Sequence, residues 1–289
     1  MNNLTDIKNR MKAIGDTRKI TKAMETVSIA KMSNAAQKCE QYSVYFDKLK
    51  DIMYDISLRT GDWVHPCFNT RKAGKTAFFV ISSDKGMVGA FNHNLTEFAY
   101  DKIKQSDNSA VYVLGEAAET FFDKKDIVIY KRFKPSNLFP SVNEAEKLAD
   151  YFSDIFLNDC ISEVYVIYSS FSSKFEVSPK MVKLLPIGRE KTEERYLYEI
   201  FYEPTPEEVL EGLVPQYLSG IIYGCMLQSV AAEHFSRRMA MAAASKNADE
   251  LLGELTKQFN SVRQNAVTSE ISDIINSAYG VCDERNSAE

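Results

Sequence analysis

Two short segments of this chain contain part of the residue pattern of a phosphate-binding loop. Gly74-Lys75-Thr76 matches the end of G-x-x-x-x-G-K-T, a motif whose backbone amides and lysine bind phosphate oxygens. The first glycine of that motif would fall at Asn69, and the triplet precedes a strand-like run instead of a helix. The segment 84–89 does lie between a strand and a helix, but it lacks the G-x-G-x-x-G spacing, and no acidic residue ends the next strand. We interpret the triplet as a chance match and the segment 84–89 as a glycine turn.

The other residue types that support catalysis or metal binding are widely separated. His65, His93 and His234 have no cysteine or carboxylate at metal-ligand spacing. Ser82-Ser83-Asp84 follows a strand, where serine and aspartate side chains more simply cap the next helix. The five cysteines are scattered and form no C-x-x-C pair, so we expect reduced, structural thiols. The sequence therefore predicts no catalytic residue, no metal site and no cofactor.

Composition and charge narrow the class of protein. The chain has 289 residues, 45% hydrophobic and 26% charged, which is ordinary for a protein that buries a core. Its net charge of −5 argues against a general nucleic-acid-binding protein, which needs clustered positive charge. Wholly apolar runs such as 77–81 are far too short to cross a bilayer, and the N-terminus lacks the apolar stretch of a secretory signal. We expect the chain to remain in the cytosol or on the cytosolic face of a membrane.

Two very long helices are predicted at the ends of the chain. One spans Thr5 to Arg59 and the other Thr205 to Gly280. At about 1.5 Å per residue the second would be on the order of 100 Å long, so most of it cannot pack inside a domain of this size. Its start is marked by Thr205 as N-cap, Pro206 and Glu208, a capping box, while Pro215 predicts a kink or a later start.

Both helices carry apolar residues at the three-and-four spacing of a coiled coil. In the first helix the predicted seam runs through Leu4, Ile7, Met11, Ile14, Ala23, Met24, Val27, Ala30 and Ala35. In the second it runs through Leu210, Leu213, Tyr217, Leu227, Ala231, Met241, Ala248, Leu252, Leu255, Phe259, Val262 and Ala266. The repeat is close to 3.5 residues, which predicts an antiparallel, left-handed coiled coil between the two ends of the chain.

Strands and helices alternate in the middle of the chain. The predicted strands are 76–82, 110–114, 127–133 and 164–169, with an edge strand at 175–185, and the predicted helices are 95–105, 117–124 and 143–157. A helix between successive strands implies parallel pairing with right-handed crossovers. The predicted fold class is therefore α/β: a Rossmann-like domain inserted between the two helices of a long antiparallel coiled coil. We divide the chain into a shaft helix at 1–60, an α/β foot at 61–200 and a second shaft helix at 201–289.

Basic residues along the two helices could contact a partner. They are Arg18, Lys19, Lys22 and Lys31 on the first helix, and Arg237, Arg238, Lys246, Lys257 and Arg263 on the second. Surface charges usually only solvate a helix face and contribute little to stability. Because these helices project from the domain, contact with a partner protein is at least as good an explanation of these charges as a solvated helix face.

Motifs at both ends of the chain resemble the gamma subunit of the rotary F-type ATP synthase. The resemblance rests on 7–10, 20–25 and 30–32 at the N-terminus, 81–86 in the first strand and turn, and Arg237, 239–241, 247–248, Leu255, Asn260, Arg263-Gln264, Ile271 and Ile274 in the last helix. It covers the whole chain. The chain differs at 87–91, where the family more often has a cysteine and paired glycines before its asparagine, here Asn92, and it has a longer link at 63–69 and no redox-regulatory cysteine insert.

The resemblance implies a non-catalytic central-stalk rotor. Its partners would be the alpha and beta subunits, the epsilon subunit and the membrane c-ring, at the cytoplasmic face of the cell membrane and bound there only through the complex. The chain would transmit torque, couple ion transport to ATP synthesis or hydrolysis, and so regulate catalytic activity and ion flow. No nucleic acid partner is expected.

The resemblance also assigns partner-binding residues. Met24, Arg237 and Glu270 correspond to coupling positions in the upper shaft, and Arg263, Gln264 and Thr268 to those that grip a beta-subunit loop. Ile200, Tyr202 and Glu203 fall in the segment that contacts the ring. Two other classes stay open on the residues alone: a self-associating coiled-coil scaffold with an α/β ligand-binding head, and a nucleotide-binding enzyme that uses the Lys75 or Gly86 loop.

Overall fold

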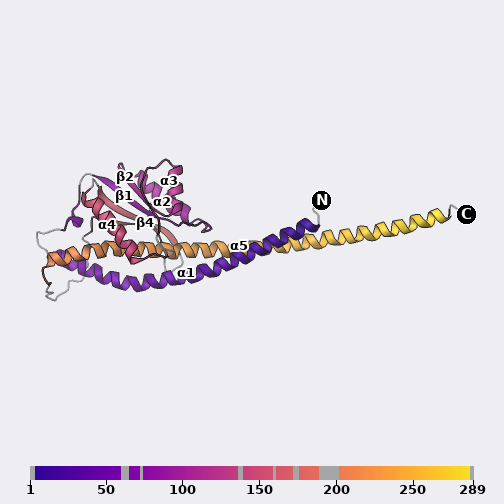
Figure 1. Cartoon of the computed structure of the whole chain (residues 1–289), viewed down its shortest axis with the longest axis horizontal. Coiled ribbons are helices and arrows are strands. Elements are labelled where there is room, and N and C mark those ends of the chain that lie inside the picture. The colour runs from indigo at the N-terminus through magenta and orange to yellow at the C-terminus, as the bar shows by residue number, and fades with distance from the viewer. Residues whose placement is uncertain are drawn as a thin grey trace. The chain divides into compact units, whose positions relative to one another are not determined.

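The computed structural model describes residues 4–59, 65–71, 74–135, 139–158, 161–171, 176–188 and 202–286. These residues form two compact units, one of Met1–Thr26 with Met241–Glu289 and the other of Val27–Ala240. Two long helices contribute to both units: α1 spans Leu4–Arg59 and α5 spans Pro206–Asn286. Figure 1 labels both helices and the α/β elements. The described helices contain no apolar stretch long enough to cross a membrane.

The second unit contains a five-stranded sheet with helices on both faces. Its strands are β1 (Lys75–Ile81), β2 (Ser109–Leu114), β3 (Ile129–Phe133), β4 (Ile161–Phe171) and β5 (Val177–Leu185), in the order β3-β2-β1-β4-β5. The β1, β2, β3 and β4 strands pair in parallel, and β5 pairs antiparallel with β4. This confirms the Rossmann-like arrangement and the edge strand. The helices between strands are α2 (Phe91–Lys104), α3 (Glu116–Lys124) and α4 (Val142–Asn158), each within a few residues of its prediction.

Alternate side chains of the central strands enter two separate cores. Ala77, Phe79 and Ile81 face a core that includes α4 and the parts of α1 and α5 in this unit. Phe78 and Val80 face a second core with α2 and α3. Because both faces of the sheet are covered, the strands read as continuous apolar runs and not as an alternating pattern. In this unit α5 is therefore part of the domain core over much of its first half.

The antiparallel pairing of α1 and α5 is confirmed within each unit. In the first unit Thr21 contacts Ser245 and Arg18 contacts Asp249, so the two helices run in opposite directions. In the second unit the rings of Tyr42 and Tyr223 meet edge to face, with centroids 4.9 Å apart. A Cβ on Gly220 would lie 2.9 Å from atoms of the Tyr42 and Phe46 side chains, so glycine lets α1 approach closely there.

One part of the predicted α1 seam is wrong. Ala23, Val27 and Ala30 are exposed, whereas Thr21 and Ser28 are buried. The buried or half-buried positions repeat every seven residues along the whole helix: Ile7, Ile14, Thr21, Ser28, Ala35, Tyr42, Leu49 and Ile56. A search for apolar residues alone misses Thr21 and Ser28, the two hydroxyl residues of this seven-residue repeat. Small polar side chains can occupy a helix interface when they hydrogen-bond there.

The start of α5 agrees with its sequence signal. The amide of Glu208 donates to Thr205 Oγ1 at 3.2 Å, which satisfies one of the free amides of the first turn. The helix begins at Pro206 and continues past Pro215, so the later start that Pro215 predicts is not found. Proline has no amide hydrogen, so the carbonyl at position 211 loses its helical partner. Residue 215 is exposed, so that carbonyl can bond to water instead.

Candidate functional site

The Gly74-Lys75-Thr76 triplet lies at the amino end of β1, where no phosphate-binding loop forms. Lys75 Nζ donates to the hydroxyl of Tyr130 at 2.8 Å and lies 5.0 Å from the centre of that ring. Parallel α/β sheets bind phosphates at the carboxyl ends of their strands, next to a helix N-terminus. The lysine is therefore at the opposite end of the strand from any such site, as expected for a chance match.

The turn after β1 is occupied by the chain's own side chains. Ser82 Oγ accepts from the amide of Ala118 at 3.0 Å, and Asp84 Oδ1 accepts from the amide of Glu116 at 3.2 Å. These amides belong to the first turn of α3, so the two side chains satisfy donors that the helix N-terminus leaves free. The N-cap of α3, Gly115, has a φ of 103°, and a Cβ there would lie 2.4 Å from the Ser82 carbonyl oxygen. The turn therefore has a capping role, and Gly115 makes the close contact possible.

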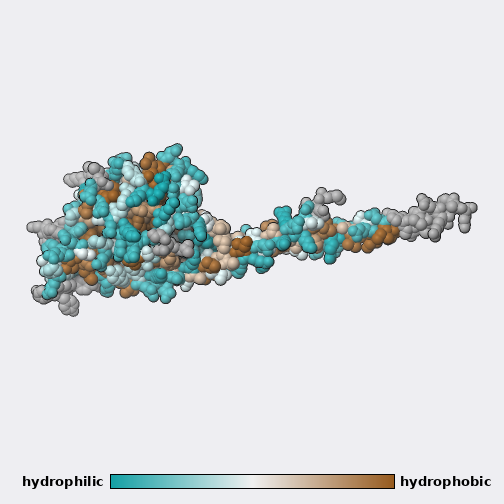
Figure 2. Space-filling view, viewed as in Figure 1, coloured by the Kyte–Doolittle hydropathy of each residue, from teal (hydrophilic) through white to brown (hydrophobic). Residues whose placement is uncertain are grey.

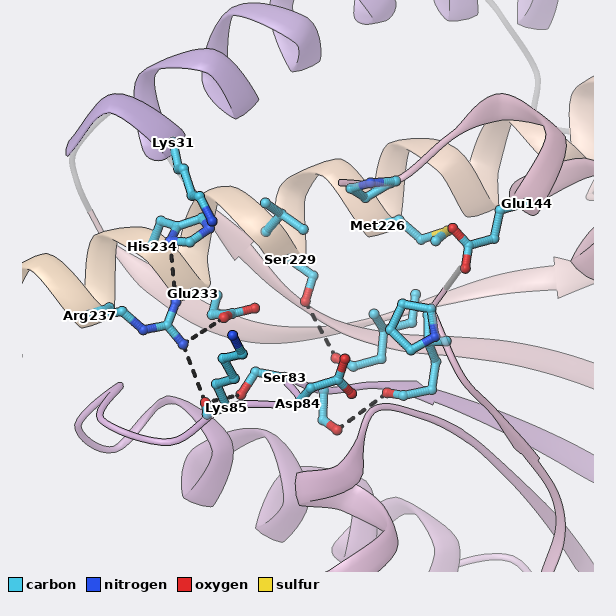
Figure 3. Close-up of a pocket in the computed structure, with 16 residues that line it drawn as sticks. Lys31, Ser83, Asp84, Lys85, Glu144, Met226, Ser229, Glu233, His234 and Arg237 are labelled. Carbon is cyan, nitrogen blue, oxygen red and sulfur yellow. Dashed lines mark hydrogen bonds and ion pairs between the residues drawn. The ribbon is translucent and has the colours of Figure 1, made fainter. Parts of the chain in front are cut away.

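A cavity of about 400 Å³, lined by both charged and apolar side chains, lies between this turn, α1 and α5 inside the second unit. Figure 3 shows Lys31, Lys85, Glu233, His234 and Arg237 at one end of it. Asp84 and Glu144 also line the cavity, so positive and negative side chains are balanced. Clustered positive side chains often contribute to phosphate binding, and this cavity has no surplus of them. The cavity therefore gives no support to the nucleotide-binding enzyme as an alternative.

Arg237 is the most connected side chain of this cavity. The residue is only 7% exposed, and its Nη2 lies 2.7 Å from Glu233 Oε1, one helical turn away. Nη2 also donates to the carbonyl oxygens of Lys85 and Gly86, at 3.3 and 3.4 Å. Nη1 lies 3.2 Å from Nδ1 of His234. The guanidinium thus connects α5 to the turn that follows β1.

Burial and nearby cations change the protonation of the two neighbours of Arg237. Burial, followed by the charges of Arg237 and Lys31, lowers the pKa of His234 to about 4, so the imidazole is neutral near pH 7. Burial raises the pKa of Glu233, an effect that the Arg237 charge and its hydrogen bond oppose. Since a guanidinium can only donate, the neutral imidazole accepts at Nδ1. Both neighbours therefore accept hydrogen bonds from Arg237.

The first unit has a polar contact in its helix interface. The hydroxyl oxygens of Thr21 and Ser245 lie 2.8 Å apart, and both residues are buried. Arg18 and Asp249 form an ion pair next to it, but each side chain is about half exposed, so the pair contributes little. Met24 is half-buried one turn from Thr21. The two hydroxyls hold the register of the helices where apolar side chains are sparse.

Residues 267–275 of α5 are exposed on all sides of the helix. Each described side chain from residue 267 to residue 275 is exposed, including Val267, Ile271, Ile274 and Ile275. Figure 2 shows this hydrophobic surface next to the grey residues at the C-terminal end. Arg263, Gln264, Thr268 and Glu270 are also exposed, and the Thr268 hydroxyl donates to the carbonyl oxygen of Gln264 at 2.9 Å. A helix with exposed isoleucines and no covering helix has the surface of a binding segment.

The segment assigned to the ring is only partly described. Ile200 lies outside the described residues. The hydroxyl of Tyr202 donates to Asp55 of α1, and Glu203 is exposed. Tyr202 thus connects the segment that precedes α5 to α1 within the second unit.

The structure separates the predicted site residues into distinct groups. Arg263, Gln264, Thr268 and Glu270 lie together on the exposed end of α5, whereas Arg237 is buried in the other unit. Sequence reasoning missed the partners of Arg237, namely Glu233, His234 and the 85–86 carbonyls. The spacing of Glu233 and Arg237, four residues apart on one helix, could have indicated the ion pair. Among the described residues, no group of histidine, cysteine and acidic side chains could hold a metal ion.

The fold is similar to that of chains in solved ATP synthase structures. It superimposes on a chain of the Euglena gracilis mitochondrial ATP synthase OSCP/F1/c-ring structure with a TM-score of 0.68 at 13% identity, covering 96% of this chain and 94% of that one. It also matches a chain of the Tetrahymena thermophila mitochondrial central stalk/c-ring structure, with a TM-score of 0.62 at 19% identity, covering 78% of this chain and 99% of that one. At these identities the likeness establishes the fold.

Sequence similarity establishes the family. The family model described as ATP synthase matches residues 3–281. The ATP synthase gamma chain of Alkaliphilus metalliredigens is 32% identical over 282 residues, 95% of this chain and 97% of that protein. That of Acetivibrio thermocellus is 33% identical over 291 residues, 96% of this chain and 99% of that protein. The chain belongs to the ATP synthase gamma chain family.

Proposed function

We propose that this chain is the central rotor of an F-type ATP synthase. It turns inside a hexamer of alpha and beta subunits and transmits torque between that hexamer and a membrane ring that carries ions. Membership of the gamma chain family supports this role. So do structural neighbours that are described as a central stalk with c-ring and as a rotor. By setting the conformation of the catalytic sites, the rotor regulates both their activity and the flow of ions.

The exposed end of α5 is the observation that carries this proposal. Val267, Ile271, Ile274 and Ile275 are each about half exposed or more, which is costly for a helix that stays in water. These four residues follow the i, i+4, i+7, i+8 spacing, so they form one apolar stripe along this part of α5. In this proposal the inner surface of a hexamer of alpha and beta subunits covers the stripe.

Polar residues on the same segment act as contacts with the hexamer. Arg263, Gln264 and Thr268 engage a loop of a beta subunit, and Glu270 lies within the same exposed stretch. Hydrogen bonds to such groups can form and break as the rotor turns, because each is exposed and worth only about 1 kcal/mol. Met24 contributes a half-buried coupling contact on α1.

The segment just before the N-terminal end of α5 contacts the ring in this proposal. Ile200, Tyr202 and Glu203 form the contact segment, and the Tyr202 bond to Asp55 fixes part of it to α1. The epsilon subunit binds beside it. The chain is then a peripheral subunit on the cytoplasmic face of the cell membrane.

Catalysis belongs to other subunits in this proposal. Lys75 of the first phosphate-loop candidate donates to Tyr130, and Asp84 of the second accepts from the first turn of α3. These internal contacts support a non-catalytic role. Titration of magnesium-ATP into the isolated chain should show no saturable heat. Micromolar binding that Lys75→Ala abolishes would instead support an enzyme.

Co-purification tests the assembly directly. An affinity tag on the chain should isolate alpha and beta subunits in threefold excess over it, together with an epsilon subunit and a ring. A tagged chain that is recovered only as a homodimer would support the coiled-coil scaffold and contradict the rotor.

A further inference from the structure

We propose that Arg237 is a positioning residue that acts from inside the chain. It holds the turn of residues 82–87 against α5, and it influences coupling through that turn without touching a partner subunit. The part of this inference that concerns coupling rests on the rotor function proposed above. The part that concerns the turn rests on contacts within the second unit alone.

The guanidinium recognises the backbone of the turn. Its Nη2 donates to the carbonyl oxygens of Lys85 and Gly86, two successive residues after β1. These acceptors belong to the main chain, so they fix the path of the turn and not the rotamer of one side chain. Nη2 reaches the two carbonyls while Nη1 faces His234, and the single ammonium nitrogen of a lysine cannot occupy both places. The interaction therefore depends on arginine at this position.

The charge of Arg237 is satisfied inside the chain. Glu233 pairs with it at 2.7 Å, and the side chains of Arg237 and Glu233 are only 9% and 19% exposed. His234 accepts a further bond while neutral. Little of the guanidinium surface remains for another protein. Any effect of Arg237 on a partner subunit must therefore act through the turn of residues 82–87.

Other contacts place the same turn against the same stretch of α5. The hydroxyl of Ser229 lies 3.4 Å from the carbonyl oxygen of Ile81, where the turn begins. Val88 and Phe91, just after the turn, form a small buried cluster with Ala232 of α5. Arg237 thus closes a contact that begins at Ser229 and continues through Ala232, two helical turns in all.

The turn ends in a residue that needs this support. Met87 has a φ of 62° and is 61% exposed. For a residue with a side chain the left-handed region is uncommon and costs free energy unless neighbouring contacts enforce it. The two carbonyls that Arg237 holds immediately precede Met87. Releasing them would let this exposed tip relax to another conformation.

Hydrogen–deuterium exchange of the full chain tests the role of Arg237 in the turn. Arg237→Gln should make the amides of residues 83–91 exchange at least tenfold faster, and Arg237→Lys, which keeps the charge beside Glu233, should also accelerate them. The matched control is Arg238→Gln, the neighbouring arginine, which should leave the exchange unchanged. Unchanged exchange in both Arg237 variants would overturn the proposal.

The assembled complex tests whether coupling depends on the turn. ATP-driven ion pumping per ATP hydrolysed should fall severalfold in Arg237→Gln. A disulfide from Val88→Cys with Ala232→Cys, which closes the same contact, should restore it, and reduction should remove the rescue. Failure of the oxidised disulfide to restore coupling would favour direct contact with a partner and contradict the inference. Absence of pumping in the wild-type complex would contradict the rotor function instead, and the exchange experiment would still decide the role of Arg237.

Discussion

The hydroxyl groups of Thr21 and Ser245 meet 2.8 Å apart in the interface between α1 and α5, although 224 residues separate them in the sequence. Both residues are buried, at 9% and 8% exposure. A hydroxyl pair in a helix interface favours one register, because a shift by one residue would separate the two groups and break the bond between the helices. This contact defines how the two ends of the chain pair in the first unit.

An engineered disulfide should therefore form within one chain. Thr21→Cys with Ser245→Cys brings the two sulfur atoms to the places of oxygens already in contact. Non-reducing electrophoresis after mild oxidation should show a compact monomer. The control pair, Thr21→Cys with Thr256→Cys, lies about three turns out of register and should not close within the chain. Crosslinks that form only between chains would show that the helices pair in a dimer.

Two glycine substitutions should have opposite effects on stability. Gly115→Ala should lower the free energy of unfolding by more than about 2 kcal/mol, because its φ is 103° and the new Cβ would lie 2.4 Å from a backbone oxygen. Gly253→Ala should raise it by about 0.5–1 kcal/mol, because this glycine lies within α5 and nothing approaches the new Cβ within 4 Å. Urea unfolding of both variants measures the difference. Equal stability of the two variants would contradict the geometry of the turn after β2.

Acid should destabilise the second unit through His234. Its folded pKa is about 4, whereas the unfolded imidazole titrates near its ordinary value of 6.5. Between these values the unfolded chain binds a proton that the folded chain does not, so the free energy of unfolding falls as the pH drops from about 6.5 to 4. The loss from this group is on the order of 2–3 kcal/mol. Glu233 acts in the opposite direction, because its raised pKa adds stability as it protonates.

Unfolding of His234→Gln at several pH values measures this contribution. The variant should show a shallower decline between pH 6.5 and 4 than the wild type, and His93→Gln, at an exposed position of α2, should keep the wild-type slope. An unchanged slope in His234→Gln would mean that the buried imidazole does not control the acid transition.

Removal of the polar contacts at the end of α5 should affect turnover and not folding. Arg263→Ala with Gln264→Ala should lower ATP hydrolysis or torque in the assembled complex severalfold. Both side chains are exposed, so the free energy of unfolding should change by less than about 0.5 kcal/mol. Lys257→Ala, another exposed cation on α5, is the control for loss of charge. Wild-type rates in the double variant would exclude these two residues from coupling.

Much of the fold could be predicted because local signals agree with tertiary packing. The α5 seam through Leu227, Met241, Ala248 and Leu255 is buried as predicted, since each position is apolar and regularly spaced. The predicted α1 seam missed Thr21 and Ser28 because both are polar, and the partner of the Thr21 hydroxyl across the interface, Ser245, lies in a distant segment. Sequence periodicity contains no information on that partner.

The site was predictable only in part for the same reason. Arg237 could be selected by resemblance, but its bonds to the carbonyls of Lys85 and Gly86 join segments about 150 residues apart through backbone atoms, which have no residue-type signature. The contacts proposed for Arg263 and Gln264 are with other subunits, so their roles remain predictions. The division of the chain into shaft and foot segments is likewise a prediction.

Single-molecule rotation tests the central claim most directly. A bead can be attached to a cysteine at Val128, which is 74% exposed in the α/β domain, in a variant without the native cysteines, and the hexamer of alpha and beta subunits fixed to glass. If this chain is the rotor, addition of ATP will turn the bead in one direction with three pauses in each turn. Complexes that hydrolyse ATP while a bead on this chain stays still would contradict the account.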